Sequence, residues 1–217
     1  MIYWIAFISG YSMVIAGIIG LIRFKSVPVA YQPFVYFTWL AFTNDVLSSI
    51  LIPIWHTNAV NGNIYVLLEA FLFLWLFYNW GTLKEKSWHL PVLGSSLLLI
   101  WILDNFVLHK ITLINSLFRI CYSFVLVFLG INQLNAMIVG ERGNMLRNAK
   151  FLICTGICIF YSYKAFLEVF YLFQSDKNIP LLNNVFLILA FVNLFVTFIY
   201  ALAALWIPTK QKFTQLS

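Results

Sequence analysis

The chain has 217 residues, of which 63% are hydrophobic, 19% are aromatic and 9% are charged. Soluble domains carry roughly 25% charged residues, so this chain has too few charges to cover a water-exposed surface, and its mean hydropathy of +0.92 agrees. The composition excludes a soluble enzyme, a nucleic-acid-binding module and a disulfide scaffold. The net charge of +6 comes from basic residues in short segments between apolar runs, a pattern that membrane topology explains without a nucleic-acid partner.

Seven apolar stretches follow one another along the chain. A membrane-spanning helix needs about 20 predominantly apolar residues, and each stretch reaches that length. Turn signals such as Asn61-Gly62 separate them. The sequence therefore predicts an all-α integral membrane protein, a seven-transmembrane-helix bundle that forms a single domain with no soluble domain. The predicted spans are residues 2–22, 33–55, 64–83, 90–108, 113–139, 151–173 and 181–207.

Basic residues gather in the loops on one side of this predicted bundle. The loops of the other side contain Lys110 and Lys177. Cytoplasmic loops carry an excess of Lys and Arg, so we expect the N-terminus outside and the C-terminus in the cytoplasm of a multi-pass plasma-membrane protein (inner membrane in a bacterium). The inner loops also offer a surface for a cytoplasmic protein partner, in addition to the membrane lipids. Their nine basic residues are Arg23, Lys25, Lys84, Lys86, Arg142, Arg147, Lys150, Lys210 and Lys212.

Ionisable residues inside the predicted spans are the best pointer to a site. Each costs on the order of 2.5–3.5 kcal/mol at the centre of a membrane helix, so it usually faces the bundle interior and has a partner. In the predicted topology all of them lie at mid-depth or in the outer half, with Glu69 about two turns below the outer surface. This asymmetry predicts an outward-leaning polar pocket. The six residues are Asp45, Glu69, Asp104, Arg119, Lys164 and Glu168.

Helical spacing aligns several of these charges with other polar side chains. Asn115, Arg119 and Tyr122 share one face of the fifth predicted span, and Tyr161 lies on the face of Lys164 and Glu168 in the sixth. Polar faces of several helices are thus expected to converge. The candidate ligand- or ion-binding residues are Asp45, Glu69, Arg119, Lys164, Glu168, Tyr122, Tyr161 and Asn115.

A purely structural network is the alternative interpretation of these charges. Lys164 and Glu168, four residues apart, could neutralise each other, and Arg119 could pair with Glu69 or Asp104 without any ligand. Four acids and two bases nevertheless leave a formal charge of −2 inside the spans. If water solvates Asp104 at the interface, one further acid still needs a proton, a cation or a cationic ligand. The surplus of acidic residues is therefore a physical reason to propose proton or cation coupling.

The sequence predicts no cofactor and no metal site. His56, His89 and His109 form no HxxH, HxxxH or HExxH pair, and seven-helix membrane hydrolases of the ceramidase and adiponectin-receptor type use such a pair. The layout is similar to that of retinal proteins, which carry their Schiff-base lysine in the last helix. No lysine occurs between Asn178 and Thr209, and Lys164 lies one helix too early.

Two function classes fit this reading. The first is a ligand-binding or sensing protein that signals to a cytoplasmic partner through its basic inner loops. The second is a small transporter or channel with proton or cation coupling, in which Gln133 and Asn79 could hydrate an inner path. An intramembrane enzyme comes third, because no nucleophile constellation appears, and a wholly structural subunit is also compatible. The absence of ionisable residues from the predicted inner half favours sensing over transport.

Overall fold

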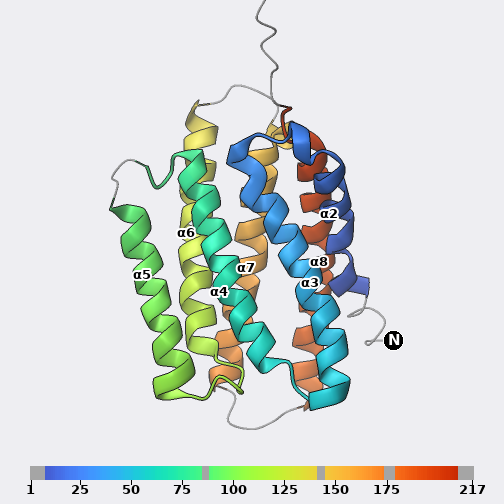
Figure 1. Ribbon diagram of the computed structural model, residues 1–217, viewed down its shortest axis with the longest axis vertical. Helices are drawn as coiled ribbons and strands as arrows, with labels where there is room; N and C mark the ends of the chain where they lie inside the picture. The colour runs from blue at the N-terminus through green and yellow to red at the C-terminus, as the bar shows by residue number, and fades with distance from the viewer. Residues whose placement is uncertain (1–7, 85–87, 141–144, 174–178, 210–217) are drawn as a thin grey trace, which may run out of the picture.

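The structure, a computed structural model, describes residues 8–84, 88–140, 145–173 and 179–209, and within these ranges it is all-helical (Figure 1). The long helices lie side by side along one axis of the molecule. They are α2 (Met13–Ile22), α3 (Gln32–Trp55), α4 (Ala59–Trp80), α5 (His89–Ile102), α6 (Ser116–Gly140), α7 (Ala149–Phe173) and α8 (Ile179–Trp206). Short turns of other helix types are η1 (Phe24–Ser26), η2 (Val29–Tyr31), η3 (Leu103–Leu108) and η4 (Met145–Arg147).

Six helices are long and apolar enough to cross a membrane, as a multi-pass membrane protein requires. They are Val29–Trp55, Ala59–Trp80, His89–Leu108, Ser116–Gly140, Ala149–Leu172 and Leu187–Trp206. The predicted first span is described from Ile8 onward, and Ile8–Ile22 forms a shorter apolar helix. Residues 2–7 of that span lie outside the described part of the chain. The count of seven spans thus stays a prediction.

The helix boundaries change the depth of one predicted site residue. Helix α4 begins at Ala59, five residues before the start of the predicted span at residue 64. Glu69 is therefore the eleventh residue of this 22-residue helix, about 15 Å from its first residue at 1.5 Å per residue. The carboxylate thus lies at the middle of the bundle rather than two turns below its outer surface, as the sequence had indicated.

The helices close into a ring in which the first described helix meets the last. Helix α2 packs against α3 and α8, and α3–α4, α6–α7 and α7–α8 are also neighbours. Helices α4 and α6 touch each other directly while α5 contacts both, and α5 buries little beyond Leu97. Helix α5 therefore lies on the outside of a ring formed by the other six, at one edge of the bundle in Figure 1.

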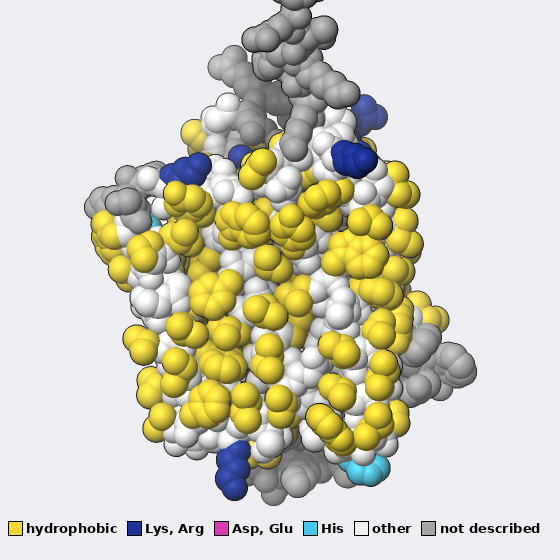
Figure 2. Space-filling model, in the orientation of Figure 1, with side chains coloured by type: hydrophobic (Ala, Val, Ile, Leu, Met, Phe, Trp, Pro, Cys, Tyr) yellow, Lys and Arg dark blue, Asp and Glu magenta, His cyan; other side chains and the backbone are white. Residues whose placement is uncertain are grey.

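The outer surface and the core of the bundle have different chemistry. Large apolar side chains such as Ile22, Val139 and Phe128 are exposed, and hydrophobic side chains cover the sides of the molecule, whereas most of the visible Lys and Arg gather at one end (Figure 2). That distribution suits a surface surrounded by lipid. Part of the core is an aromatic cluster, in which Phe37 lies 4.5 Å from Phe73 and 6.0 Å from Tyr200, centroid to centroid. The cluster consists of Phe34, Phe37, Phe73, Phe77, Tyr161 and Tyr200.

Arg23 ties the end of α2 to the end of α8. Its guanidinium donates to the carbonyl oxygens of Ala204 and Ile207, each at 2.7 Å, and to that of Leu205. The last carbonyls of a helix have no intrahelical partner, and a positive charge is favourable at this end of a helix. The C-terminal ends of α2 and α8 are thus fastened together on the side that the sequence predicts to be cytoplasmic.

Close packing of α7 on α8 depends on Gly156. A Cβ atom at Gly156 would clash with Cε1 of Tyr200, whereas no atom of a described neighbour lies within 4 Å of one at Gly140. We expect Gly156→Ala to destabilise the protein by about 1–3 kcal/mol through overpacking and to lower its melting temperature in detergent. The matched Gly140→Ala variant is expected to keep the wild-type melting temperature; equal effects of both variants would contradict this packing.

Candidate functional site

A buried carboxylate lies at the centre of the site. The Glu69 side chain is 1% exposed, and its Oε1 accepts a hydrogen bond from the Tyr65 hydroxyl at 2.6 Å. Its Oε2 accepts one from the Tyr122 hydroxyl at 2.6 Å and lies 3.3 Å from Nζ of Lys164. Lys164 also donates to the Tyr122 hydroxyl. We call these four residues, which come from α4, α6 and α7, the Glu69 cluster.

Aromatic rings surround the Lys164 ammonium. Its Nζ lies 5.1 Å from the ring centroid of Tyr122, 5.5 Å from that of Phe160 and 5.4 Å from that of Tyr161. A ring face attracts a cation, most strongly where water is excluded, and the Lys164 side chain is 12% exposed. The cation is therefore held by one carboxylate and three rings. Tyr161 contributes its ring, while its buried hydroxyl has no hydrogen-bond partner among the described residues.

A second charged group, the outer network, lies at the start of α6. Arg119 Nη1 is 3.7 Å from Oε1 of Glu168, and Ser116 donates to Oε2 of Glu168 at 2.5 Å. Arg119 Nη2 also donates to the side-chain oxygen of Asn63 at 3.2 Å. The Asn63 amide in turn donates to the carbonyl oxygens of Ile111 and Leu113. The network thus joins α4, α6 and α7 to the segment before α6.

Asp104 stabilises the start of α6 and lines neither of the two cavities at the site. It is fully buried, accepts the backbone N–H of Phe118 at 2.8 Å and lies 2.9 Å from Nδ1 of His109. A carboxylate that accepts an N–H from the first turn of a helix stabilises that helix end. Asp104 is thus buried rather than solvated at the interface, and Arg119 forms neither of its two possible pairs, with Asp104 or with Glu69, because it pairs with Glu168.

The structure does not bring Asn115 into the pocket. Helix α6 begins at Ser116, one residue after it, so the helical spacing that put Asn115 on the face of Arg119 does not apply. Its amide nitrogen donates to Asn105 at 2.9 Å, within the segment that precedes α6. The pairing of Lys164 with Glu168 is absent as well, since the Lys164 ammonium pairs with Glu69.

Asp45 on α3 differs from the other intramembrane acids, because it forms no ion pair with any described cation. The neighbouring Asn44 side chain accepts a hydrogen bond from Asn61 at 2.9 Å. Arg119 and Lys164 are already paired with Glu168 and Glu69. Asp45 is thus one of the two acids that the charge count leaves without a Lys or Arg partner; the other, Asp104, contacts His109 instead.

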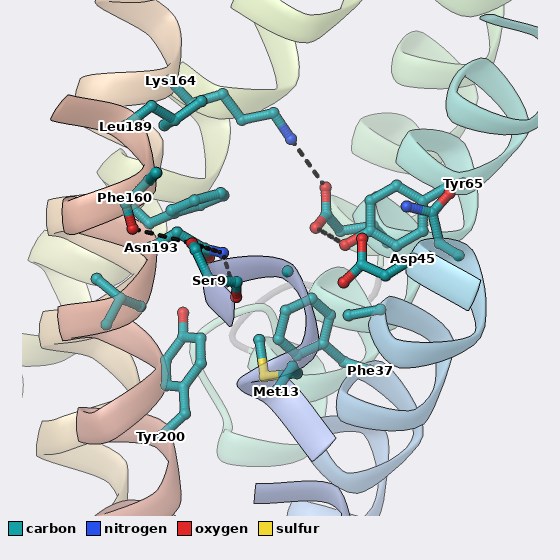
Figure 3. Close-up of a pocket in the computed structure, with 16 residues that line it drawn as sticks. Ser9, Met13, Phe37, Asp45, Tyr65, Phe160, Lys164, Leu189, Asn193 and Tyr200 are labelled. Carbon is teal, nitrogen blue, oxygen red and sulfur yellow. Dashed lines mark hydrogen bonds and ion pairs between the residues drawn. The ribbon is translucent and has the colours of Figure 1, made fainter. Parts of the chain in front are cut away.

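Asp45 and three members of the Glu69 cluster (Tyr65, Glu69 and Lys164) face a cavity of about 340 Å³, the main cavity, between α2, α3, α4, α7 and α8 (Figure 3). On the opposite side from Asp45, the Asn193 amide donates to the carbonyl and the hydroxyl oxygen of Ser9, at 3.1 and 3.0 Å. Apolar residues, among them Met13 and Val196, line the remainder. The polar lining residues are Ser9, Asn44, Asp45, Tyr65, Glu69, Lys164, Asn193 and Tyr200.

A smaller outer cavity of about 180 Å³ adjoins the main cavity. Arg119, Glu168 and Tyr171 line it. Phe160, Lys164 and Leu189 line both cavities, so these three side chains form the boundary between them. The two cavities together extend from the outer network to the middle of the bundle.

Some lining residues were absent from the candidates that the sequence supplied. Tyr65 lies one turn before Glu69 on α4, and Asn193 and Tyr200 are seven residues apart on α8, so helical spacing could have revealed all three. Ser9 gave no such signal, because a serine in an apolar helix is common. Within the described residues no group of three or more His, Cys, Asp or Glu side chains is placed to hold a metal ion.

Comparison of the chain with protein-family models, with curated proteins and with solved structures finds no match. The chemistry of the site thus rests on its own geometry. A cavity with an acidic side chain that has no ion pair, amide and hydroxyl groups and an apolar wall is suited to binding a small molecule.

Two tyrosine-to-phenylalanine variants distinguish a required hydroxyl from a spare one. The Tyr122 hydroxyl supports the buried Glu69 carboxylate, whereas the buried Tyr200 hydroxyl has no described partner. We expect Tyr122→Phe to reduce stability by about 1–3 kcal/mol, since it leaves a buried charge less compensated. Tyr200→Phe should match or exceed wild-type stability. Melting curves in one detergent test both, and the reverse order would contradict the assignment.

Proposed function

We propose that the chain is a seven-span membrane protein, with its N-terminus outside, that binds a small ligand in the main cavity and signals to a cytoplasmic partner. One observation carries this proposal: the main cavity adjoins an outer cavity through Lys164, Phe160 and Leu189, and the aromatic cluster lies on its inner side. A ligand that arrives from outside would then meet a closed floor. A receptor needs such a closed inner side, whereas a conducting path must be open there.

Polar residues of the inner half support sensing over transport. Gln133 accepts a hydrogen bond from Thr82, and Asn79 donates to the carbonyl oxygen of Val29 at 3.4 Å. Neither residue lines the main or the outer cavity. These groups therefore hold helix ends together instead of hydrating a path through the bundle.

The output would pass through the helix ends on the predicted cytoplasmic side. A ligand in the main cavity would contact α8 through Asn193 and Tyr200, and Arg23 fastens the far end of α8 to α2. Basic residues such as Lys25 and Arg147 lie in the loops at this end. A partner with an acidic surface would complement them.

A transporter with cation coupling is the second candidate, and the surplus charge of Asp45 favours it. A carboxylate without an ion pair, in the middle of a bundle, is a common place for a transported or coupling ion. Transport would also require the aromatic cluster to open toward the cytoplasm. The accessibility experiment below separates the two candidates.

The predicted orientation can be tested with one cysteine at each end of the molecule. In a variant whose Cys121, Cys154 and Cys158 are replaced by alanine, Thr57→Cys lies between α3 and α4 and Thr209→Cys follows α8. Both positions are exposed. We expect a membrane-impermeant maleimide outside intact cells to modify residue 57, and residue 209 only after lysis. The opposite result would invert the topology.

Access to the cavity can be tested with three cysteine positions on α8. Leu189 lies at the boundary of the two cavities, Asn193 lines the main cavity and Ala203 is fully buried in the inner half. We expect external methanethiosulfonate reagents to modify Leu189→Cys and Asn193→Cys and to leave Ala203→Cys unmodified. Modification of residue 193 from the cytoplasmic side as well would support transport, and its protection from both sides would overturn the proposal.

A further inference from the structure

The main cavity holds an acidic side chain whose charge, when it is ionised, the described residues do not neutralise. Asp45 lines it without an ion pair to any described cation, while Glu69, in the same cavity, is already neutralised by Lys164. A charge in an apolar bundle is costly unless an opposite charge or hydrogen bonds compensate it. The segment before α2 approaches Asp45 with Gly10, where an added Cβ would lie 3.7 Å from Cγ of Asp45, in ordinary van der Waals contact.

A second polar group in the cavity also has no partner. The Tyr200 side chain is 2% exposed, and its buried hydroxyl makes no hydrogen bond among the described residues. Figure 3 shows this hydroxyl pointing into the cavity, across from Asp45. Buried hydroxyls are normally hydrogen-bonded, so the position of Tyr200 indicates a polar atom that the protein does not supply.

The wall between these two groups is apolar. Met13, Phe37, Ala41 and Val196 line it. The volume of about 340 Å³ lies within the range of small-molecule sites. A proton on Asp45 would neutralise the charge, but it would leave the apolar volume and the Tyr200 hydroxyl unexplained. A bare metal ion finds no third acidic or histidine ligand among the described residues.

We propose that the main cavity binds a small organic ammonium ion with an apolar body. The ammonium forms an ion pair with Asp45, the apolar body packs against Phe37 and Val196, and Tyr200 hydrogen-bonds a polar atom at the other end of the ligand. Lys164, at the boundary with the outer cavity, remains with Glu69, so the incoming cation does not compete for that carboxylate. This inference rests on the proposed function and names its ligand class.

The test compares two probes that differ in charge and hardly in shape. Phenethylamine is a cation at neutral pH, and phenethyl alcohol is its neutral counterpart. Binding of each to the full chain in lipid nanodiscs is measured by calorimetry. Because hydrogen bonds to charged groups are stronger than neutral ones, we expect wild type to bind the amine on the order of tenfold to a hundredfold more tightly than the alcohol.

Three variants assign this preference to Asp45. Asp45→Asn keeps the shape of the side chain and should bring the amine and the alcohol to similar affinities. Asp104→Asn is the matched control, because it removes an intramembrane carboxylate that lines neither cavity, and it should keep the preference. Ala41→Leu fills part of the main cavity without changing any charge and should weaken both probes together.

Each outcome bears on a different proposal. Equal binding of both probes to wild type, or a preference that survives Asp45→Asn, overturns the ammonium site. If neither probe binds while Leu189→Cys and Asn193→Cys react from outside, the ligand class is wrong and the ligand-binding proposal stands. If neither probe binds and both cysteines are protected, both proposals fail. A preference that is lost in Asp45→Asn and kept in Asp104→Asn confirms the site.

Discussion

A carboxylate buried halfway along an apolar bundle is the constraint on which this structure depends. The Glu69 side chain is only 1% exposed, so the protein supplies the groups that compensate its charge. Tyr65 comes from the same helix, but Tyr122 comes from α6 and Lys164 from α7. Their contacts fix how α6 and α7 are rotated against α4. The Tyr161 ring next to Lys164 is placed by the same rotation, and so is one wall of the main cavity.

A purely structural interpretation explains all the intramembrane charges except Asp45. It accounts for Glu69 with Lys164, for Glu168 with Arg119 and for Asp104, which caps α6 and contacts His109. These contacts hold helices and loops in place and need no ligand. The same interpretation leaves Asp45 unexplained, although it lines the same cavity as Glu69. The structural network and the proposed binding site are therefore not alternatives, because the Glu69–Lys164 pair forms part of the wall of the cavity that Asp45 lines.

The sequence predicted the helical bundle and most of the charged residues of the site, because apolar length and the cost of buried charge act locally. It could not predict which charges pair, since partners lie on different helices and the helix boundaries decide which residues share a face and how deep they lie. Helix α6 begins at Ser116, and this single boundary removes Asn115 from the face of Arg119. The early start of α4 at Ala59 likewise moves Glu69 to mid-depth. That the Tyr200 hydroxyl has no described hydrogen-bond partner could not be predicted either, because it depends on how the helices pack.

Tyr200 belongs to two parts of the molecule, and this links the cavity to the inner half. Its hydroxyl faces the main cavity, while its ring packs against Phe34 and Phe37 and closely approaches Gly156 of α7. A ligand that changes the position of this ring must also change the packing of α8 on α3 and α7, because a close-packed interior transmits displacement. The end of α8 is fastened to α2 by Arg23. Such a route needs no ionisable residue in the inner half, where the described helices bury aromatic rings. We favour a receptor over a transporter because packing alone can carry the signal along this route.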